Sequence, residues 1–396
     1  MKLSNDAKIV ILDKAIGNVI EIFLSTFLAA YFYKITQDNL IYISIYHIIS
    51  WIMATIGAFC VANYIKTKNK VNLYRFGTFL KALYVLLIII LKEQIIDYVW
   101  LIGICYGISV ACTGFPFNMM ESELVEEKER TKYMGYKSAI GQIVKVVVPI
   151  ILGAYITFTS YQIAATLVLV FSIIKLGISF FIKNKNVSKG KLNILEFLKE
   201  VKKHSEYPIK KLYIIEFLKG ITLYGALDII ILLLIIYEFN TELNLGIWTS
   251  IFSVCKIITM MLFAKFYNKK KPNAVLMLIA ISVFSSFIWM LLSINKTTII
   301  LYNLVYYTFM EILLSITEIH LFDYSNKHPF AEEYNTEYFT IREVFINSGR
   351  VLGYIILLIV GFTHNMEYLK ILFLFSTVAL LLIIVLSKSI SKQGEH

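Results

Sequence analysis

The sequence has 396 residues, of which 58% are hydrophobic and only 16% are charged, and its mean hydropathy is +0.71. This composition excludes a soluble globular protein, because a water-soluble domain needs more charged residues to cover its surface. The net charge of +11 would suit nucleic acid. However, the basic residues gather in connections on one side of the predicted membrane segments, so they indicate membrane topology, and nucleic acid is not an expected partner.

A helix of about 20 apolar residues spans the hydrocarbon core of a bilayer, and the sequence contains twelve segments of this kind. We therefore predict an all-α membrane protein with twelve transmembrane helices in two pseudo-symmetric six-helix bundles. In chain order the segments cover residues 15–34, 40–64, 74–91, 97–119, 134–158, 160–182, 211–237, 245–267, 273–293, 297–322, 338–362 and 366–387.

The longest connection lies between the sixth and seventh segments and divides the chain into halves. The expected domains are an N-terminal bundle over 1–182, a cytoplasmic linker over 183–210 and a C-terminal bundle over 211–396. With six helices in each half, the halves are expected to be parallel repeats. Apolar residues recur at helical spacing within the linker, so we expect either a short amphipathic helix along the cytoplasmic surface or a solvated tether.

Basic residues are concentrated in the connections after the second, sixth and eighth segments, whereas the opposite connections are short and nearly uncharged. The positive-inside rule then predicts a multi-pass protein of the cell membrane with both termini in the cytoplasm. The first fifteen residues contain no small-residue cleavage site, so no cleaved signal peptide is expected. The basic residues are Lys66, Lys68, Lys70, Arg75, Lys183, Lys185, Lys189, Lys191, Lys269, Lys270 and Lys271.

The eleventh segment, 338–362, carries polar residues that conflict with a membrane position. A cation at bilayer depth costs at least ~2.5 kcal/mol on insertion scales and must face a polar environment. One of these residues is Arg342. The others are spaced four, three and four residues apart and form one stripe on the helix, namely Glu343, Asn347, Arg350 and Tyr354. The fifth segment, 134–158, repeats the pattern with Lys137 in place of Arg342 and the stripe Ser138, Gln142, Lys145 and Pro149.

Similar stripes in the first, seventh, eighth and tenth segments bring the number of intramembrane charges of interest to six. In one interpretation these six residues form fixed ion pairs that specify helix packing. In the other they line a water-filled cavity in which carboxylates exchange protons and cations bind an anionic group. We favour the cavity, because a buried ion pair is about break-even in stability against apolar residues. The six are Glu21, Asp228, Glu311, Lys145, Lys256 and Arg350.

The candidate residues for substrate binding and proton coupling are taken from these stripes. Lys81 and Lys175 lie outside them and are expected to snorkel or to contact the protein. Glu216 and Lys219 open the seventh segment near the cytoplasmic surface, where a charge costs little. The candidates are Glu21, Asn18, Gln142, Lys145, Asp228, Lys256, Glu311, Arg342, Asn347 and Arg350.

Two parallel halves of six helices, a long basic linker and cytoplasmic termini resemble the major facilitator superfamily. The short motifs match in part. Of the GxxxGPxxGG signature in the fifth helix of exporters, Pro149 and Gly153 are clearly present. The sequence ERTKYMG over 129–135 is similar to the acidic, basic and glycine run that the family has between its fourth and fifth helices.

Two positions depart from the family pattern. Gly57 is followed four residues later by Val61, where the family has an aspartate. Gly107 matches a glycine of the fourth helix, but Gly103 stands where proton-coupled antiporters carry an arginine. The family fold implies that helices 1, 2, 4, 5, 7, 8, 10 and 11 surround a central cavity, and all six intramembrane charges fall on these helices.

The resemblance implies a secondary active transporter that works by alternating access. We expect proton-coupled efflux, by antiport, of a small amphipathic or anionic molecule. Protons would be the coupling ion, no cofactor or metal would be bound, and the protein would be a monomer in the lipid bilayer. Export is preferred because of Pro149, Gly153 and an aromatic content of 15%.

Several alternatives remain open. A lipid or glycolipid flippase and a solute uptake permease could have the same fold, and a membrane sensor that transports nothing is a further possibility. An enzyme is not expected. The six histidines are scattered, and the sequence offers no nucleophile and base pair and no metal ligands at chelating spacing.

Overall fold

A computed structural model describes residues 3–37, 39–124, 129–183, 190–266, 272–327, 333–363 and 368–393. Within these ranges every regular element is a helix. Eleven spans among them are long and apolar enough to cross a membrane, and the expected third segment, 74–91, lies in a further helix, Lys70–Leu91. The predicted all-α membrane fold is therefore confirmed. The basic residues Lys185, Lys189 and Lys269–Lys271 lie outside the described ranges.

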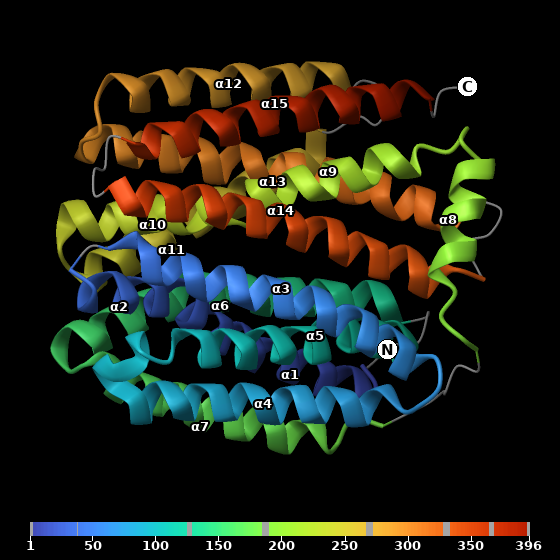
Figure 1. The fold of residues 1–396 in the computed structure, drawn as a ribbon, viewed down its shortest axis with the longest axis horizontal. Coiled ribbons are helices and arrows are strands. Elements are labelled where there is room, and N and C mark those ends of the chain that lie inside the picture. The colour runs from blue at the N-terminus through green and yellow to red at the C-terminus, as the bar shows by residue number, and fades with distance from the viewer. Residues whose placement is uncertain are drawn as a thin grey trace. The chain divides into compact units, whose positions relative to one another are not determined.

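The chain forms two compact units. Unit 1 comprises Met1–Lys191 and Phe239–Ser250, and unit 2 comprises Leu192–Glu238 and Ile251–His396. The helices of unit 1 are α1 (Asn5–Ile22), a π-helical turn (Phe23–Phe27), α2 (Leu28–Ile35), α3 (Leu40–Ile65), α4 (Lys70–Leu91), a 3-10 helix (Lys92–Ile96), α5 (Val99–Leu124), α6 (Arg130–Phe158) and α7 (Tyr161–Ser179) (Figure 1).

Helix starts in unit 1 follow local capping chemistry. The side-chain oxygens of Ser4, Asn39, Asn69 and Ser160 accept hydrogen bonds from backbone N–H groups in the first turns of α1, α3, α4 and α7. Such caps satisfy N–H groups that have no partner within the helix. The first span therefore begins at Asn5, ten residues before the expected start, because Ser4 provides the cap.

The helices of unit 2 include one break within an expected membrane segment. The seventh segment, 211–237, was predicted as one helix, but it is divided at Thr222–Gly225. The helices are α8 (Ile194–Lys203), α9 (Ile209–Ile221), α10 (Ala226–Phe239), α11 (Glu242–Phe266), α12 (Pro272–Leu292), α13 (Lys296–Lys327), α14 (Asn335–Thr363) and α15 (Leu369–Gln393). Helix α11 begins in unit 1 and continues in unit 2.

Helix α8 confirms the amphipathic helix in the linker, and the alternative of a solvated tether is wrong over these residues. Phe197 is fully buried and Val201 is 5% exposed, whereas Leu195 is 77% exposed. The Phe197 ring packs against Tyr334 and Tyr338, at the start of α14. The inner face of α8 is thus fixed to unit 2 by aromatic contacts.

Glycines allow one pair of helices in unit 2, α9 and α14, to approach closely. Helices α9 and α14 lie side by side (Figure 1), and Gly220 faces Gly349 where they cross. A Cβ atom at Gly349 would collide with the carbonyl oxygen of Phe217, and one at Gly220 would collide with that of Ile346. This close crossing positions the polar residues of α14 against the end of α9.

Candidate functional site

The break in the seventh membrane segment exposes backbone groups inside unit 2. Helix α9 ends at Ile221 and α10 begins at Ala226, so the carbonyls between them lack their usual helical donors. The carbonyl oxygen of Thr222 accepts from the hydroxyl of Tyr306 at 3.3 Å, and that of Tyr224 accepts from Nε of Arg350 at 3.1 Å. Side chains of α13 and α14 therefore supply hydrogen bonds that a continuous helix would supply itself.

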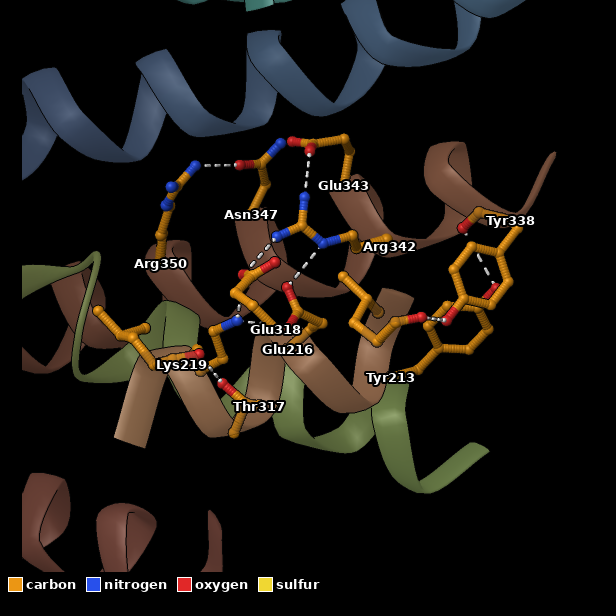
Figure 2. Close-up of polar contacts among 12 residues, drawn as sticks. Tyr213, Glu216, Lys219, Thr317, Glu318, Tyr338, Arg342, Glu343, Asn347 and Arg350 are labelled. Carbon is orange, nitrogen blue, oxygen red and sulfur yellow. Dashed lines mark hydrogen bonds and ion pairs between the residues drawn. The ribbon is translucent and has the colours of Figure 1, made fainter. Parts of the chain in front are cut away.

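Arg350 on α14 lies at this break, which the sequence analysis did not predict. Its Nη1 donates to Oδ1 of Asn347 at 2.7 Å, and its guanidinium carbon lies 5.6 Å from the centre of the Tyr224 ring. Asn347 is almost completely buried. Arg350 and Asn347 therefore act as one polar unit, and Figure 2 shows their side chains pointing toward each other.

Asp228 lies in the first turn of α10, directly beyond the break. Its Oδ1 accepts a hydrogen bond of 2.6 Å from the hydroxyl of Tyr306. Within the described ranges, no cation lies within ion-pairing distance of this carboxylate. This distinguishes Asp228 from Glu21 and Glu311, the other two carboxylates of the candidate set.

Glu21 and Glu311 are both held in ion pairs. The carboxylate of Glu311 on α13 lies 2.5 Å from Nζ of Lys256 on α11. Glu21 on α1 accepts from Nζ of Lys81 on α4. Of the two roles expected for Lys81, snorkelling or a contact with the protein, the contact is thereby confirmed. Lys175 also contacts the protein, through Asp13.

A second group of charges, which we call the charge cluster, joins α9, α13 and α14. It consists of Glu216, Lys219, Glu318 and Arg342 (Figure 2). Nζ of Lys219 lies 2.6 Å from Glu216 and 2.8 Å from Glu318. Nε of Arg342 lies 2.9 Å from Glu216, and its Nη2 lies 3.1 Å from Glu318. Each acid thus contacts both cations, in an arrangement with no net charge.

The charge cluster changes the interpretation of three residues. Glu216 and Lys219 were expected where charge costs little, but their side chains are 1% and 0% exposed. Their charges are instead balanced by direct ion pairs, which buried charges require. Arg342 belongs to this cluster, whereas Arg350 lies two turns further along α14 at the helix break. The two arginines of α14 therefore have different surroundings.

The candidate residues of unit 1 lie on α1 and α6. Lys145 is exposed on α6. Oε1 of Gln142 is buried and accepts no hydrogen bond from the described residues. Asn18 on α1 faces Gly141 of α6. A Cβ atom added to Gly141 would lie 3.5 Å from Nδ2 of Asn18. Asn18 and Gln142 therefore lie on neighbouring helices.

The sequence interpretation missed one buried ion pair in unit 1. Asp13 on α1 is fully buried. Its Oδ2 lies 2.6 Å from Nζ of Lys175 on α7 and accepts a 2.5 Å hydrogen bond from the hydroxyl of Tyr74 on α4. Lys175 alone gave a signal, as a cation in mid-segment. Asp13 was overlooked because it precedes the expected start of the first segment.

The sequence also matches the model of a protein family. The model for the Major Facilitator Superfamily matches residues 118–354 of this chain. The chain belongs to the Major Facilitator Superfamily. It is accordingly an integral multi-pass membrane protein with the fold of that transporter family.

The individual proteins that this chain resembles are distant from it in sequence. The uncharacterized protein YqgE of Bacillus subtilis (strain 168) is 23% identical over 341 residues, which are 85% of this chain and 78% of YqgE. A bacterial homologue of the iron transporter ferroportin, in its inward-facing state, has a TM-score of 0.71 at 14% identity and covers 99% of this chain and 100% of its own. The nucleoside transporter NupG has a TM-score of 0.70 at 12% identity, covering 99% and 100%. At these identities the two structures support the fold alone.

Helix packing explains how this chain matches and departs from the superfamily motifs. At Gly103 of α5, a Cβ atom would lie 3.0 Å from the carbonyl oxygen of Tyr46 in α3. An arginine would not fit at this crossing without displacing α3. At Gly153 of α6, a Cβ atom would collide with the carbonyl of Glu242 in the first turn of α11. Both glycines are thus required for close helix contacts.

Proposed function

We propose that the protein is a secondary active transporter that works by alternating access and exports a small amphipathic or anionic molecule in exchange for protons. The observation that carries this proposal is the environment of Asp228. It is a carboxylate in a membrane-spanning segment, at a helix break, whose hydrogen-bond partner is the neutral hydroxyl of Tyr306. It can therefore take up a proton without breaking an ion pair.

The other carboxylates of the candidate set are less suited to this role. Glu21 is paired with Lys81, and Glu311 is paired with Lys256 at 2.5 Å. Protonating either would leave its cation without a counter-charge inside the membrane, which is costly. We therefore assign proton coupling to Asp228 and a packing role to the pairs of Glu21, Glu311 and Lys256. Arg342 takes the same role in the charge cluster.

Substrate recognition is assigned to Arg350 and Asn347 in unit 2. A guanidinium is a strong donor to carboxylate, sulfonate and phosphate groups, and Arg350 is held beside the unwound backbone by the carbonyl of Tyr224. Transporters commonly bind substrates and coupling ions at such discontinuous helices. In unit 1, Asn18, Gln142 and Lys145 are the residues that we assign to the substrate.

The proposed location is the cell membrane, with both termini in the cytoplasm and the protein acting as a monomer. The basic residues Lys66, Lys68, Lys70 and Arg75, which follow the second span, support this orientation by the positive-inside rule. In inside-out vesicles the cytoplasmic face would be accessible to added compounds. Export would then move a compound into the vesicle and protons out of it.

The test uses inside-out vesicles whose interior is acidified by respiration, with a fluorescent dye that reports the pH gradient. Octanesulfonate is a suitable anionic amphiphile, because sulfonic acids are strong and the compound cannot itself carry a proton. We expect it to release protons from wild-type vesicles and not from Asp228→Asn vesicles. Glu343→Gln, which removes a partly exposed carboxylate of α14, is the matched control and should behave as wild type.

Two outcomes would contradict the proposal. Proton release of equal size in Asp228→Asn vesicles would exclude Asp228 as the coupling residue. A wild-type response no larger than that of vesicles without the protein would exclude proton-coupled export of this anionic amphiphile.

A further inference from the structure

Lys14 on α1 is a cation of the first membrane-spanning segment to which the proposed function gives no role. The segment covers Asn5–Ile35, so Lys14 lies about 14 Å along it, at 1.5 Å per residue. The side chain is exposed, and its ammonium lies 5.4 Å from the centre of the Phe117 ring on α5. Phe117 is only 6% exposed. The ammonium is therefore held against the interior of unit 1 and remains accessible to a ligand.

The charged side chains around Lys14 pair with one another and not with Lys14. Glu21, Lys81, Glu121 and Lys137 act on Lys14 electrostatically. Of these, Glu21 is paired with Lys81, and Glu121 is paired with Lys137. Among the residues that the structure describes, no carboxylate lies within ion-pairing distance of Lys14. Because both pairs are neutral, this group of side chains carries one net positive charge, which is the charge of Lys14.

The neighbouring cation Lys175 on α7 has the counter-charge that Lys14 does not have. Nζ of Lys175 lies 5.9 Å from the centre of the same Phe117 ring, and it also lies 2.6 Å from Oδ2 of Asp13. A cation inside a membrane segment is costly, and such residues commonly mark the path of a substrate or ion. An anion that reached Lys14 would provide the missing counter-charge.

Two amide side chains near Lys14 have hydrogen-bonding groups that the described part of the chain does not use. Asn18 follows Lys14 by four residues, so both side chains lie on one face of α1. Nδ2 of Asn18 approaches Gly141 of α6, and Gln142 is the next residue of that helix. Neither side-chain amide forms a hydrogen bond with another described residue. An oxyanion could therefore accept from both amides while it pairs with the ammonium of Lys14.

We propose that Lys14 is the residue that selects an anionic headgroup at the substrate site of unit 1, with Asn18 and Gln142 donating to the same headgroup. The proposal rests on the proposed function for the class of cargo and for the roles of these two amides. It adds the source of the charge. A sulfonate or carboxylate is attracted by an ammonium that has no counter-charge, whereas a quaternary ammonium is repelled by it.

The test measures equilibrium binding to the full-length protein in phosphatidylcholine nanodiscs by calorimetry, and titration of empty nanodiscs corrects for partitioning into lipid. Octanesulfonate, octanol and octyltrimethylammonium have the same alkyl tail and an anionic, neutral or cationic headgroup. We expect wild type to bind octanesulfonate about tenfold or more tightly than the other two, as a hydrogen bond to a charged group would give. Lys14→Gln should weaken octanesulfonate binding by about the same factor and leave octanol binding within about twofold of wild type.

Two further variants separate the charge of Lys14 from its position. Lys14→Arg keeps the charge and should bind octanesulfonate within about threefold of wild type, since both side chains pair with sulfonates. Lys8→Gln is the matched control, because Lys8 is an exposed lysine in the first turn of the same helix. It should leave binding of all three probes unchanged.

A thermal melt of the protein without ligand provides a second measurement. If Lys14 served to stabilise the fold, Lys14→Gln would lower the melting temperature. We expect the melting temperature to stay the same or to rise, because the substitution removes a charge that has no counter-charge inside the membrane segment.

Several results would overturn the proposal. One is octanesulfonate binding by Lys14→Gln within twofold of wild type, and another is Lys14→Arg binding as weakly as Lys14→Gln. Equal loss of octanesulfonate and octanol binding in Lys14→Gln, or a clearly lowered melting temperature, would assign Lys14 to folding instead.

Failure of this proposal can be told apart from failure of the proposed function. Wild type that binds octanesulfonate through Lys14 but releases no protons would contradict the proposed export and leave the role of Lys14 intact. Proton release that depends on Asp228, together with unchanged binding in Lys14→Gln, would contradict the role of Lys14 alone. A wild-type protein that binds no octanesulfonate would contradict both.

Discussion

The hydroxyl of Tyr306 lies 2.6 Å from Oδ1 of Asp228 and 3.3 Å from the carbonyl oxygen of Thr222. A tyrosine hydroxyl has one hydrogen to donate, so it can donate to only one of these acceptors at a time. When Asp228 is ionised, the carboxylate is the stronger acceptor. When Asp228 is protonated, it can donate to Tyr306, whose own hydrogen is then available to Thr222 at the helix break. In the mechanism that we propose, proton uptake by Asp228 would thereby be linked to the backbone of the break.

Tyr306→Phe should uncouple proton movement from substrate movement. It removes the hydroxyl without removing the ring, and a hydrogen bond to a charged group contributes about 1.5–3 kcal/mol. We expect octanesulfonate-dependent proton release from inside-out vesicles to fall about tenfold, while exchange of labelled octanesulfonate at equal pH changes less than twofold. Tyr302→Phe, one turn away on α13, is the control. Equal loss of both activities in Tyr306→Phe would assign the residue to folding or binding instead.

The charge cluster should contribute to stability in proportion to the burial of its acids. Glu216→Gln would leave Lys219 and Arg342 without one of their two carboxylates in a buried site, and breaking such a pair costs roughly 3–5 kcal/mol. We expect a marked fall in the melting temperature of the detergent-solubilised protein. The control is Glu343→Gln, whose carboxylate is 34% exposed and lies 3.5 Å from Arg342. It should cost about 0–1 kcal/mol, and similar losses in both variants would show that burial does not decide the effect.

The fold could be predicted from the sequence because hydropathy is summed over whole segments. The break at Thr222–Gly225 could not, because Leu223 and Tyr224 keep this stretch as apolar as a membrane helix. It depends on tertiary contacts, because Tyr306 and Arg350 donate to the carbonyls of Thr222 and Tyr224. It also depends on a close approach within the segment itself, since a side chain at Gly225 would collide with the carbonyl of Gly220. Gly225 was the available signal, but glycine also occurs within intact helices of this chain.

The candidate site was predicted in part for a related reason. Helical spacing shows which residues share a face, as it did for Asn347 and Arg350, which contact each other at 2.7 Å. It does not show which neighbouring helix that face meets. The pairing of Glu21 with Lys81 and the burial of Glu216 therefore became visible only in the structure. A charged residue within a membrane segment correctly indicated a polar contact. The sequence did not indicate which residue makes that contact.

The crossing of α9 and α14 should tolerate no side chain at Gly349. An added methyl group would meet the carbonyl of Phe217, and overpacking of this kind typically costs about 1–3 kcal/mol. Gly349→Ala should therefore lower the melting temperature by several degrees. Gly177→Ala is the matched control, because no atom lies within 4 Å of the added carbon and alanine is favoured over glycine in a helix by roughly 0.5–1 kcal/mol. A Gly349→Ala protein as stable as Gly177→Ala would contradict the close crossing.

Removing only one charge of the Asp13 and Lys175 ion pair should destabilise the fold strongly. Removing both charges together should destabilise it much less. Lys175→Met would leave the fully buried carboxylate of Asp13 uncompensated, at a cost of roughly 3–5 kcal/mol. Asp13→Asn/Lys175→Met would remove both charges and keep an acceptor for Tyr74, so we expect it to recover most of the lost melting temperature. Such recovery is the non-additivity expected of contacting residues.

The matched control for this pair is Lys183→Met. Lys183 lies 3.9 Å from Asp6, also on α1, but its side chain is 75% exposed, so its loss should change the free energy of unfolding by about 0–1 kcal/mol. If the double variant were as unstable as the sum of its two single variants, Asp13 and Lys175 would act independently. The 2.6 Å contact between them would then contribute nothing to holding α1 against α7, and the buried charges of unit 1 would need separate explanations.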